Sequence, residues 1–375
     1  MISMFLIAGC SNEQATGNVV KSQPTTSPAT SQGDIKLGWI GPLTGEAASF
    51  GQNALAGATL AVNEINAQGG INGRQIKLIT EDDKCSAAGV SAMQKLVNAN
   101  NVDAIVGPAC SASAGPAVPI AVQAGTPVMM FSASAPGLTA LGDRVFRVYP
   151  SDSFQGKEAA KFMFETLGAR KVAIAYVQND WGLGIQKVFA EEFKRLGGQV
   201  LTVESSAQGT IDFRTEIAKI KNLDVDAVYS PLYVQDGVAF VKQAKEAGLN
   251  VPLVGGDGWT AEEFLKSGQT EGAIFTVAKI DEPEAFKARV HAVKGFESVD
   301  ANLFASLGYD AVKVTAAAMQ RAGTTDKVKV TEQLYKTSYR GISSPSIEFD
   351  SEGDMKVAVY EVKQVRNNGA VPYQG

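Results

Sequence analysis

Two runs of small, hydroxyl-bearing residues follow two apolar segments of the sequence, and both could hold a small anion. Ser111 and Ser113 follow one apolar run, and Ser132 and Ser134 follow the next. If both runs are parallel strands, their carboxyl ends meet at one edge of a sheet, where ligands of open α/β sheets bind. Ser111 or Ser113 could also cap the helix that follows, with free N–H groups facing an anion. Capping explains either run alone, but two runs at adjacent strand ends indicate a carboxylate or phosphate site.

A carboxylate and two aromatic residues occupy corresponding places in the second half of the chain. Asp257 lies in the segment GGDGW at 255–259, and Trp181 and Tyr233 each follow a strand-like run. Neighbouring glycines let a ligand approach the backbone closely, and the carboxylate offers a counter-charge for an ammonium group, to which aromatic rings add cation–π attraction. A turn or capping role explains Asp257 alone, and core packing is the usual role of Trp and Tyr. Together with the hydroxyl groups, these residues match a zwitterion such as an α-amino acid.

The remaining sequence argues against catalysis and against other ligands. The single histidine, His291, lies in a helical pattern at 285–294 where a solvated or packing role is expected, which removes His-based triads and His-rich metal sites. The fingerprints G-x-G-x-x-G, Walker A and G-x-S-x-G are missing, and the acidic run at 81–83 is expected to be a solvated turn rather than a cation site. A net charge of −5 argues against nucleic acid. We expect a binding protein, not an enzyme, with no cofactor and no metal.

Alternating strand and helix patterns predict an α/β fold with two lobes. Leu55, Ala58, Val62 and Ile65, for example, recur at helical spacing before two glycines. The predicted strands span residues 35–40, 75–80, 103–107, 127–131, 171–177, 199–203, 227–231, 251–254 and 273–277. This alternation implies mostly parallel sheets covered by helices, and about ten such units exceed what one open sheet usually holds.

Proline-marked breaks at 149–151, 279–283 and 342–345 predict where the chain passes between the lobes. The first lobe is then expected to comprise residues 34–149 plus 281–342, and the second 150–280 plus 343–375. Several connections of this kind restrict motion to hinge bending, which suits a protein that closes on a ligand.

The N-terminal segment 1–10 ends in Leu-Ile-Ala-Gly-Cys, typical of a bacterial lipobox in which Cys10 carries the lipid. The polar stretch 11–33 predicts a flexible tether. Since the segment before Cys10 is short and has no basic residue, we expect the signal to begin upstream; a chance apolar N-terminus is the alternative. Export places Cys85 and Cys110 in an oxidising compartment, which favours a structural disulfide over a redox-active pair.

From residue 34 onward the sequence resembles the type I periplasmic binding proteins, specifically the leucine/isoleucine/valine-binding branch of ABC importers. The segments that carry the resemblance are 41–45, 62–73, 81–85, 107–113, 132–136 and 255–258, in the family's order. It implies two Rossmann-like lobes joined by a multi-strand hinge. It also implies a periplasmic or extracytoplasmic monomer, anchored through Cys10, that captures an amino acid and delivers it to an ABC permease.

The resemblance assigns the first-lobe residues. Cys85 and Cys110 match the family's disulfide pair. Ser111 and Ser134 match the hydroxyl groups that hold the ligand carboxylate together with backbone N–H groups, and Ser132 matches a backbone contact.

It also assigns the residues that hold the rest of the ligand. Asp257 matches the acid that pairs with the ligand ammonium, Tyr233 the aromatic residue beside it, and Trp181 a position often held by tyrosine. The positions that line the side-chain pocket are Phe50, Ala109 and Phe304.

Two departures from the family pattern concern selectivity. Ala109 is smaller than the aliphatic residue of the branched-chain binders, and Asp257 is one methylene shorter than a glutamate. We therefore predict a neutral or hydrophobic amino acid rather than strict branched-chain selectivity. An amide- or urea-binding importer component and a ligand-sensing receptor domain of the same fold are the alternatives.

Overall fold

The computed structural model describes residues 33–279 and 284–375. The predicted lipobox with Cys10 and nearly all of the predicted tether lie outside the described residues. Asp34–Gly375 forms one unit, and it contains two sheets. Among the helices in these ranges, none combines the length and the apolar character needed to cross a bilayer.

The first sheet has five parallel strands in the order β2-β1-β3-β4-β5. These are β1 (Ile35–Gly41), β2 (Ile76–Asp82), β3 (Ala104–Val106), β4 (Val128–Met130) and β5 (Val145–Arg147). Every residue of β3 and β4 is buried, as expected for central strands of a parallel sheet covered on both faces. The strand order reverses between β1 and β3, and ligands of such sheets bind beyond the carboxyl ends of the strands at that point.

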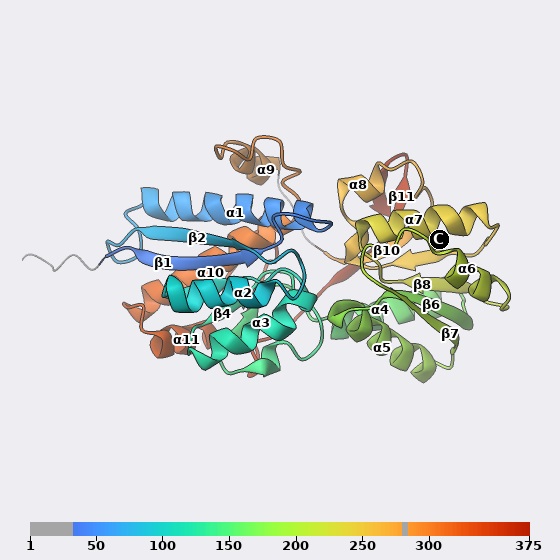
Figure 1. Cartoon of the computed structure of the whole chain (residues 1–375), viewed down its shortest axis with the longest axis horizontal. Coiled ribbons are helices and arrows are strands. Elements are labelled where there is room, and N and C mark those ends of the chain that lie inside the picture. Colours follow the sequence, from blue (N-terminus) through green and yellow to red (C-terminus); the bar gives the residue numbers. More distant parts are fainter. Residues whose placement is uncertain (1–32, 280–283) are drawn as a thin grey trace, which may run out of the picture. The chain divides into compact units, whose positions relative to one another are not determined.

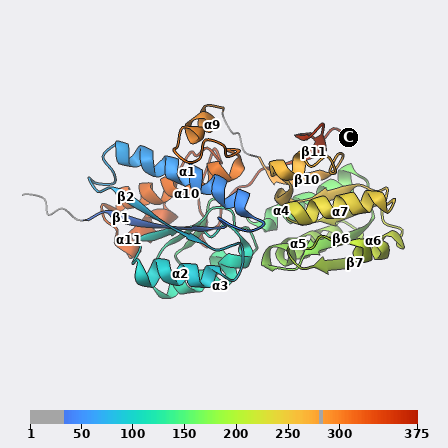
Figure 2. The same ribbon diagram turned by 45° about the horizontal axis from the view of Figure 1, so that its top comes forward.

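Helices cover both faces of the first sheet (Figures 1 and 2). On one face α1 (Ala48–Ala67), α10 (Leu303–Ala322) and α11 (Lys327–Tyr335) pack with β1, and on the other lie α2 (Gly89–Gln94) and α3 (Ser111–Gln123). The short helix α9 (Glu284–His291) ends in the exposed His291, as expected from the sequence. We call this sheet and these helices the first lobe.

Two glycines allow α1 and α10 to approach closely. A Cβ atom on Gly57 would lie 1.8 Å from the Ala305 carbonyl oxygen, and one on Gly308 would lie 2.1 Å from the Ala54 carbonyl oxygen. Any side chain at either position would therefore push the two helices apart.

The second sheet has seven strands in the order β12-β11-β10-β9-β8-β6-β7. These are β6 (Lys171–Val177), β7 (Gln199–Ser206), β8 (Ala227–Ser230), β9 (Leu253–Gly255), β10 (Ile274–Ala278), β11 (Tyr360–Arg366) and β12 (Gly369–Pro372). The strands from β6 to β10 are parallel, whereas β11 and β12 are antiparallel to their neighbours. The helices of this second lobe are α4 (Asp152–Lys161), α5 (Asp180–Arg195), α6 (Arg214–Lys221), α7 (Val234–Glu246) and α8 (Glu262–Leu265). Buried residues of α4 and α5 pack on one face of the sheet, and those of α6 and α7 on the other.

The two-lobed, mostly parallel α/β fold predicted from the sequence is confirmed, but three strands were missed. Strand β5 has only three residues, too few for a recognisable pattern. Strands β11 and β12 form a hairpin whose turn residues Asn367 and Asn368 have φ angles of 51° and 63°. Asparagine tolerates this left-handed backbone and is favoured in two-residue hairpin turns. The two asparagines could therefore have indicated the hairpin in the sequence.

The chain passes between the lobes three times, and the third passage differs from the prediction. Ser343 donates from both N and Oγ to Asp310 of α10, each at 2.6 Å, and the Phe349 ring lies 5.2 Å from that of Phe146. The prediction that residues from 343 onward join the second lobe is therefore wrong. The chain leaves the first lobe only after Met355, shortly before β11.

Candidate functional site

Side chains from both lobes line one small cavity. The lining consists of Phe50, Ala109, Cys110, Ser111, Ser132, Ser134 and Phe304 from the first lobe and Trp181, Tyr233, Asp257 and Gly258 from the second. All nine ligand-site residues predicted from the sequence lie in this set; Cys110 and Gly258 were not predicted to line it. The residues owe this placement to the strand ends, since most follow β3, β4, β8 or β9 directly.

The cavity volume is about 40 Å³, which is room for roughly three water molecules. A hydrophobic amino acid has several times as many non-hydrogen atoms as three water molecules have. Binding such a ligand therefore requires the lobes to move apart, as hinge bending permits.

A larger cavity of about 520 Å³ lies among the three passages. Its walls are mainly apolar and include Val148, Ile342, Met355 and Val359. It contains none of the predicted site residues, so its size alone does not make it the ligand site.

Ser111 is the first residue of α3, and its hydroxyl oxygen accepts two backbone hydrogen bonds. The donors are Ser134 N at 3.2 Å and Ala135 N at 3.0 Å. With both lone pairs engaged, the Ser111 hydroxyl hydrogen is left to donate into the cavity. The N–H groups at the start of α3 favour the same kind of ligand. The first N–H groups of a helix have no intrahelical acceptor, so they favour an anion.

Ser113 does not belong to the cavity, and the expected serine cap of this helix is not formed. Ser113 Oγ donates to Asp83 Oδ2 at 2.8 Å, and neither serine makes a capping hydrogen bond at the start of α3. Asp83 is fully buried and also accepts from Cys85 N at 2.9 Å. The expectation of a solvated acidic turn at 81–83 is therefore wrong for Asp83, and burial raises its pKa to about 6.

The other two serines differ in what their hydroxyl groups can offer. Ser132 Oγ donates to the Ala109 carbonyl oxygen at 2.8 Å, so its hydrogen is already used and only its backbone can serve a ligand. Ser134 Oγ lies 3.0 Å from Oδ2 of Asp152. Asp152 is fully buried and was not predicted as a site residue, because the helix dipole favours an acid at a helix start whatever its other contacts are.

The acid of the second lobe lies in the single helical turn Asp257–Trp259 after β9. Burial raises the pKa of Asp257 to about 6, and the neighbouring Tyr149 and Gln155 side chains offset part of the rise. Burial of a carboxylate without a cationic partner is costly, so this site is suited to a ligand that brings a positive charge.

An aromatic pair from each lobe completes the walls. The Phe50 and Phe304 rings stack with centroids 4.4 Å apart, and the Trp181 and Tyr233 rings stack at 4.8 Å. The first pair offers an apolar surface, and the second stands beside Asp257 where a cation would gain cation–π attraction.

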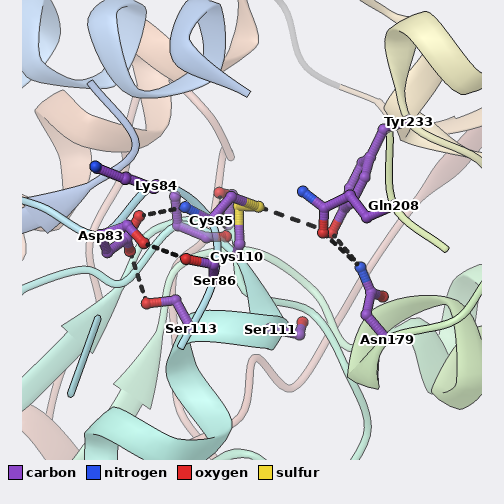
Figure 3. The surroundings of a disulfide bond; sticks show 12 residues. Asp83, Lys84, Cys85, Ser86, Cys110, Ser111, Ser113, Asn179, Gln208 and Tyr233 are labelled. Atoms are coloured by element: carbon purple, nitrogen blue, oxygen red, sulfur yellow. Dashed lines mark hydrogen bonds between the residues drawn. A yellow bond between two sulfur atoms is a disulfide. The ribbon is translucent and has the colours of Figure 1, made fainter. Parts of the chain in front are cut away.

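The predicted disulfide between Cys85 and Cys110 is confirmed. It joins the loop after β2 to the start of α3, next to the cavity (Figure 3). Across from it, the Tyr233 hydroxyl lies 3.9 Å from Cys85 Sγ and accepts from Asn179 Nδ2 at 3.4 Å. The disulfide thus fixes the segment that carries Ser111.

Removing this disulfide by the double substitution Cys85→Ser and Cys110→Ser is expected to lower the free energy of unfolding by about 2–5 kcal/mol, since the cross-link restricts the unfolded chain. Urea unfolding of the variant and of the parent protein, with and without reductant, measures the loss. An unfolding curve of the parent protein that does not respond to reductant, together with an unchanged curve of the variant, would contradict it.

Comparison with known proteins places the chain among solute-binding proteins. A family model described as "Periplasmic binding protein" matches residues 34–370. The "Leucine-, isoleucine-, valine-, threonine-, and alanine-binding protein" of Pseudomonas aeruginosa is 32% identical over 335 residues, which cover 87% of this chain and 89% of that protein.

Solved structures give the same result. The branched-chain amino acid transporter substrate binding protein LivJ of Streptococcus pneumoniae, in complex with isoleucine, is 32% identical, with a TM-score of 0.78 over 91% of this chain and 100% of that one. The leucine binding protein LivK of Thermotoga maritima is 28% identical, with a TM-score of 0.82 over 91% and 98%.

Proposed function

The chain belongs to the periplasmic binding protein family, and from this premise we propose that it is the extracytoplasmic substrate-binding component of an ABC importer for neutral or hydrophobic amino acids. Members of this family bind solutes and carry out no reaction, so the site is a binding site. The observation that carries the proposal is the pairing of hydroxyl and helix-start donors in one lobe with the Asp257 carboxylate in the other. This pairing is complementary to the two charges of an α-amino acid.

In the proposed complex, the ligand carboxylate accepts from Ser111 Oγ, from N–H groups at the start of α3 and from Ser134, with Ser132 contributing its backbone. The ligand ammonium pairs with Asp257 beside the stacked Trp181 and Tyr233. Charge-assisted hydrogen bonds of this kind are the strongest that a site can offer. The two ends of the ligand thereby link the two lobes.

The side chain of the ligand then faces Phe50, Ala109 and Phe304. These residues supply apolar area and no hydrogen-bonding groups, which favours an aliphatic or small side chain. The relatives that bind leucine, isoleucine, valine, threonine and alanine by name support a range of this breadth.

Closure supplies the signal that the permease recognises. We propose that residues 34–149 and 284–355 move as one lobe and residues 150–279 and 356–375 as the other. The ligand favours the closed form only by its greater affinity for that form. We further propose that the protein is a monomer held at the membrane through a lipid on Cys10.

Calorimetric titration tests the function. The protein is stripped of bound ligand by unfolding and refolding, and titrated with the standard amino acids, urea and short amides. Binding of neutral amino acids is expected. Binding of urea or an amide without any amino acid would refute the zwitterion site and favour the amide-binding alternative.

The substitution Ser134→Ala is expected to weaken amino-acid binding by about 1.5–3 kcal/mol, the usual contribution of a hydrogen bond to a charged group. The same titration measures it. Ser113→Ala is the matched control, since Ser113 follows the same strand end as Ser111 but donates to Asp83 instead of facing the cavity. Equal affinities of the Ser134 variant and the parent protein would place the carboxylate elsewhere.

A further inference from the structure

Asp152 is a second acid beside the ligand cavity, and it is bound to a residue that lines it. It is the first residue of α4 and is fully buried. Its backbone N–H donates to the Ser134 carbonyl oxygen at 2.8 Å, and its Oδ2 lies 3.0 Å from Ser134 Oγ. Among the described residues, Oδ1 has no hydrogen-bond partner.

Asp152 lies within hydrogen-bond distance of the neutral Ser134 hydroxyl, and the cation that acts on it is engaged with other groups. The cation that influences it, Arg147, is committed elsewhere: its side chain bonds both carboxylate oxygens of Asp354 and the carbonyl oxygens of Ala133 and Ala135. Since those contacts use four of the five N–H groups of the guanidinium, Arg147 pairs with Asp354, and its charge offsets part of the rise in the pKa of Asp152.

The other titratable groups that interact with Asp152 are Asp257 and the phenols Tyr149, Tyr229, Tyr233 and Tyr360. Burial raises the pKa of all four phenols above the ordinary value, so they stay neutral. Burial and the negative charge of Asp257 likewise raise the pKa of Asp152 well above its ordinary value. When two interacting carboxylates are removed from water, the state in which one of them carries a proton is favoured.

Asp152 does not line the cavity, so it acts on a ligand through the lining side chains that it contacts, and Ser134 Oγ lies within hydrogen-bond distance of it. The single Ser134 hydroxyl hydrogen points either to Asp152 or to the ligand. If Asp152 is ionised, it takes that hydrogen, and Ser134 presents a lone pair to the ligand carboxylate. If Asp152 carries a proton, it donates to Ser134 Oγ, and the Ser134 hydrogen is free for the ligand.

We propose that Asp152 is a positioning residue that carries a proton in the ligand-bound protein and thereby turns the Ser134 hydroxyl toward the ligand carboxylate. The inference rests on the proposed function. The two acids then divide their roles: Asp257 keeps the negative charge that the ammonium needs, and Asp152 stays neutral.

Infrared spectroscopy of the ligand-bound protein at neutral pH tests this directly. A protonated carboxylic acid has a carbonyl stretch that a carboxylate lacks. The band is expected in the parent protein, missing in Asp152→Asn, and shifted in Ser134→Ala, which removes the hydrogen-bond partner but keeps the acid. A spectrum without a band that responds to either substitution would overturn the proposal.

Binding provides the second readout. An asparagine amide donates to Ser134 Oγ as the protonated acid does, so Asp152→Asn is expected to retain the parent Kd within about threefold, whereas loss of a charge that binds ligand costs tenfold or more. A Kd raised at least tenfold would mean that Asp152 acts as an anion. If the asparagine variant does not fold, the Ser134→Ala band shift decides. If the parent protein binds no amino acid, the proposed function fails, whereas the infrared band of the unliganded protein still reports the state of Asp152.

Discussion

Replacing Asp257 with alanine is expected to weaken amino-acid binding by about 3–5 kcal/mol, a rise in Kd of roughly 150- to 5,000-fold. The cause is that closure would bury the ligand ammonium without a counter-charge. The closed cavity is lined otherwise by serines, aromatic rings and small residues, none of which carries a negative charge. Calorimetry with the best amino acid ligand measures the effect.

Two further variants separate the charge from the shape of the residue. Asp257→Asn keeps the volume but removes the charge, and it is expected to lose most of the same affinity. Asp224→Ala removes an acid whose side chain is 94% exposed in the second lobe and is expected to leave Kd unchanged. An Asp257→Ala variant that binds as tightly as the control would refute the assignment of the ammonium.

Affinity should also depend on pH through Asp257. Because burial raises its pKa to about 6 in the unliganded protein, the carboxylate that the ammonium needs is lost as the pH falls through that value. The Kd should then rise by up to about tenfold for each pH unit below 6. A pH series of titrations checks this, and the Asp257→Asn variant should show no such rise.

Replacing Arg147 with leucine is expected to lower the free energy of unfolding by about 3–5 kcal/mol, the usual result of breaking a buried ion pair from one side. Arg147 is fully buried. Its loss leaves the largely buried Asp354 carboxylate and the carbonyl groups of Ala133 and Ala135 without their donors. Urea unfolding measures the loss.

Two controls define this effect. Arg214→Ala breaks an ion pair with Asp212 whose side chains are 82% and 56% exposed, and it should leave the free energy of unfolding essentially unchanged. The double variant Arg147→Leu and Asp354→Leu should recover part of the lost stability, because no carboxylate is then left unpaired. Equal stability of the Arg147→Leu variant and the exposed-pair control would contradict the prediction.

Since Arg147 also holds the carbonyl groups on either side of Ser134, its loss should weaken ligand binding as well.

The elements that position the site were predictable because parallel strands buried on both faces have continuous apolar sequences. The residues after such strands were predictable for the same reason, and Ser111, Ser134 and Asp257 do line one cavity. What could not be predicted was which partner each hydroxyl group would find. That Ser113 turns to Asp83 depends on the geometry of another loop.

Asp152 shows the limit of sequence patterns most clearly. In the sequence it begins a helix, where an acid is favoured by the helix dipole and requires no further explanation. Its importance arises from a contact with Ser134, 18 residues earlier, and from the commitment of Arg147 to Asp354, 207 residues later. The third passage between the lobes comes later in the chain than predicted for the same reason. The pairing of Arg147 with Asp354 and the contacts of Asp310 hold residues 343–355 on the first lobe.

The close approach of α1 and α10 also determines when the protein can fold during its synthesis. Asn72, just after α1, bonds Gln320 of α10 across 248 residues of sequence, so the first lobe lacks one of its covering helices until most of the chain has been made. The second lobe waits even longer, because its sheet ends with β11 and β12 at the C-terminus. Neither half can reach its final form early in translation, because contacts between distant segments cannot form before both have been made. Each lobe therefore becomes complete only after late segments of the chain have been made.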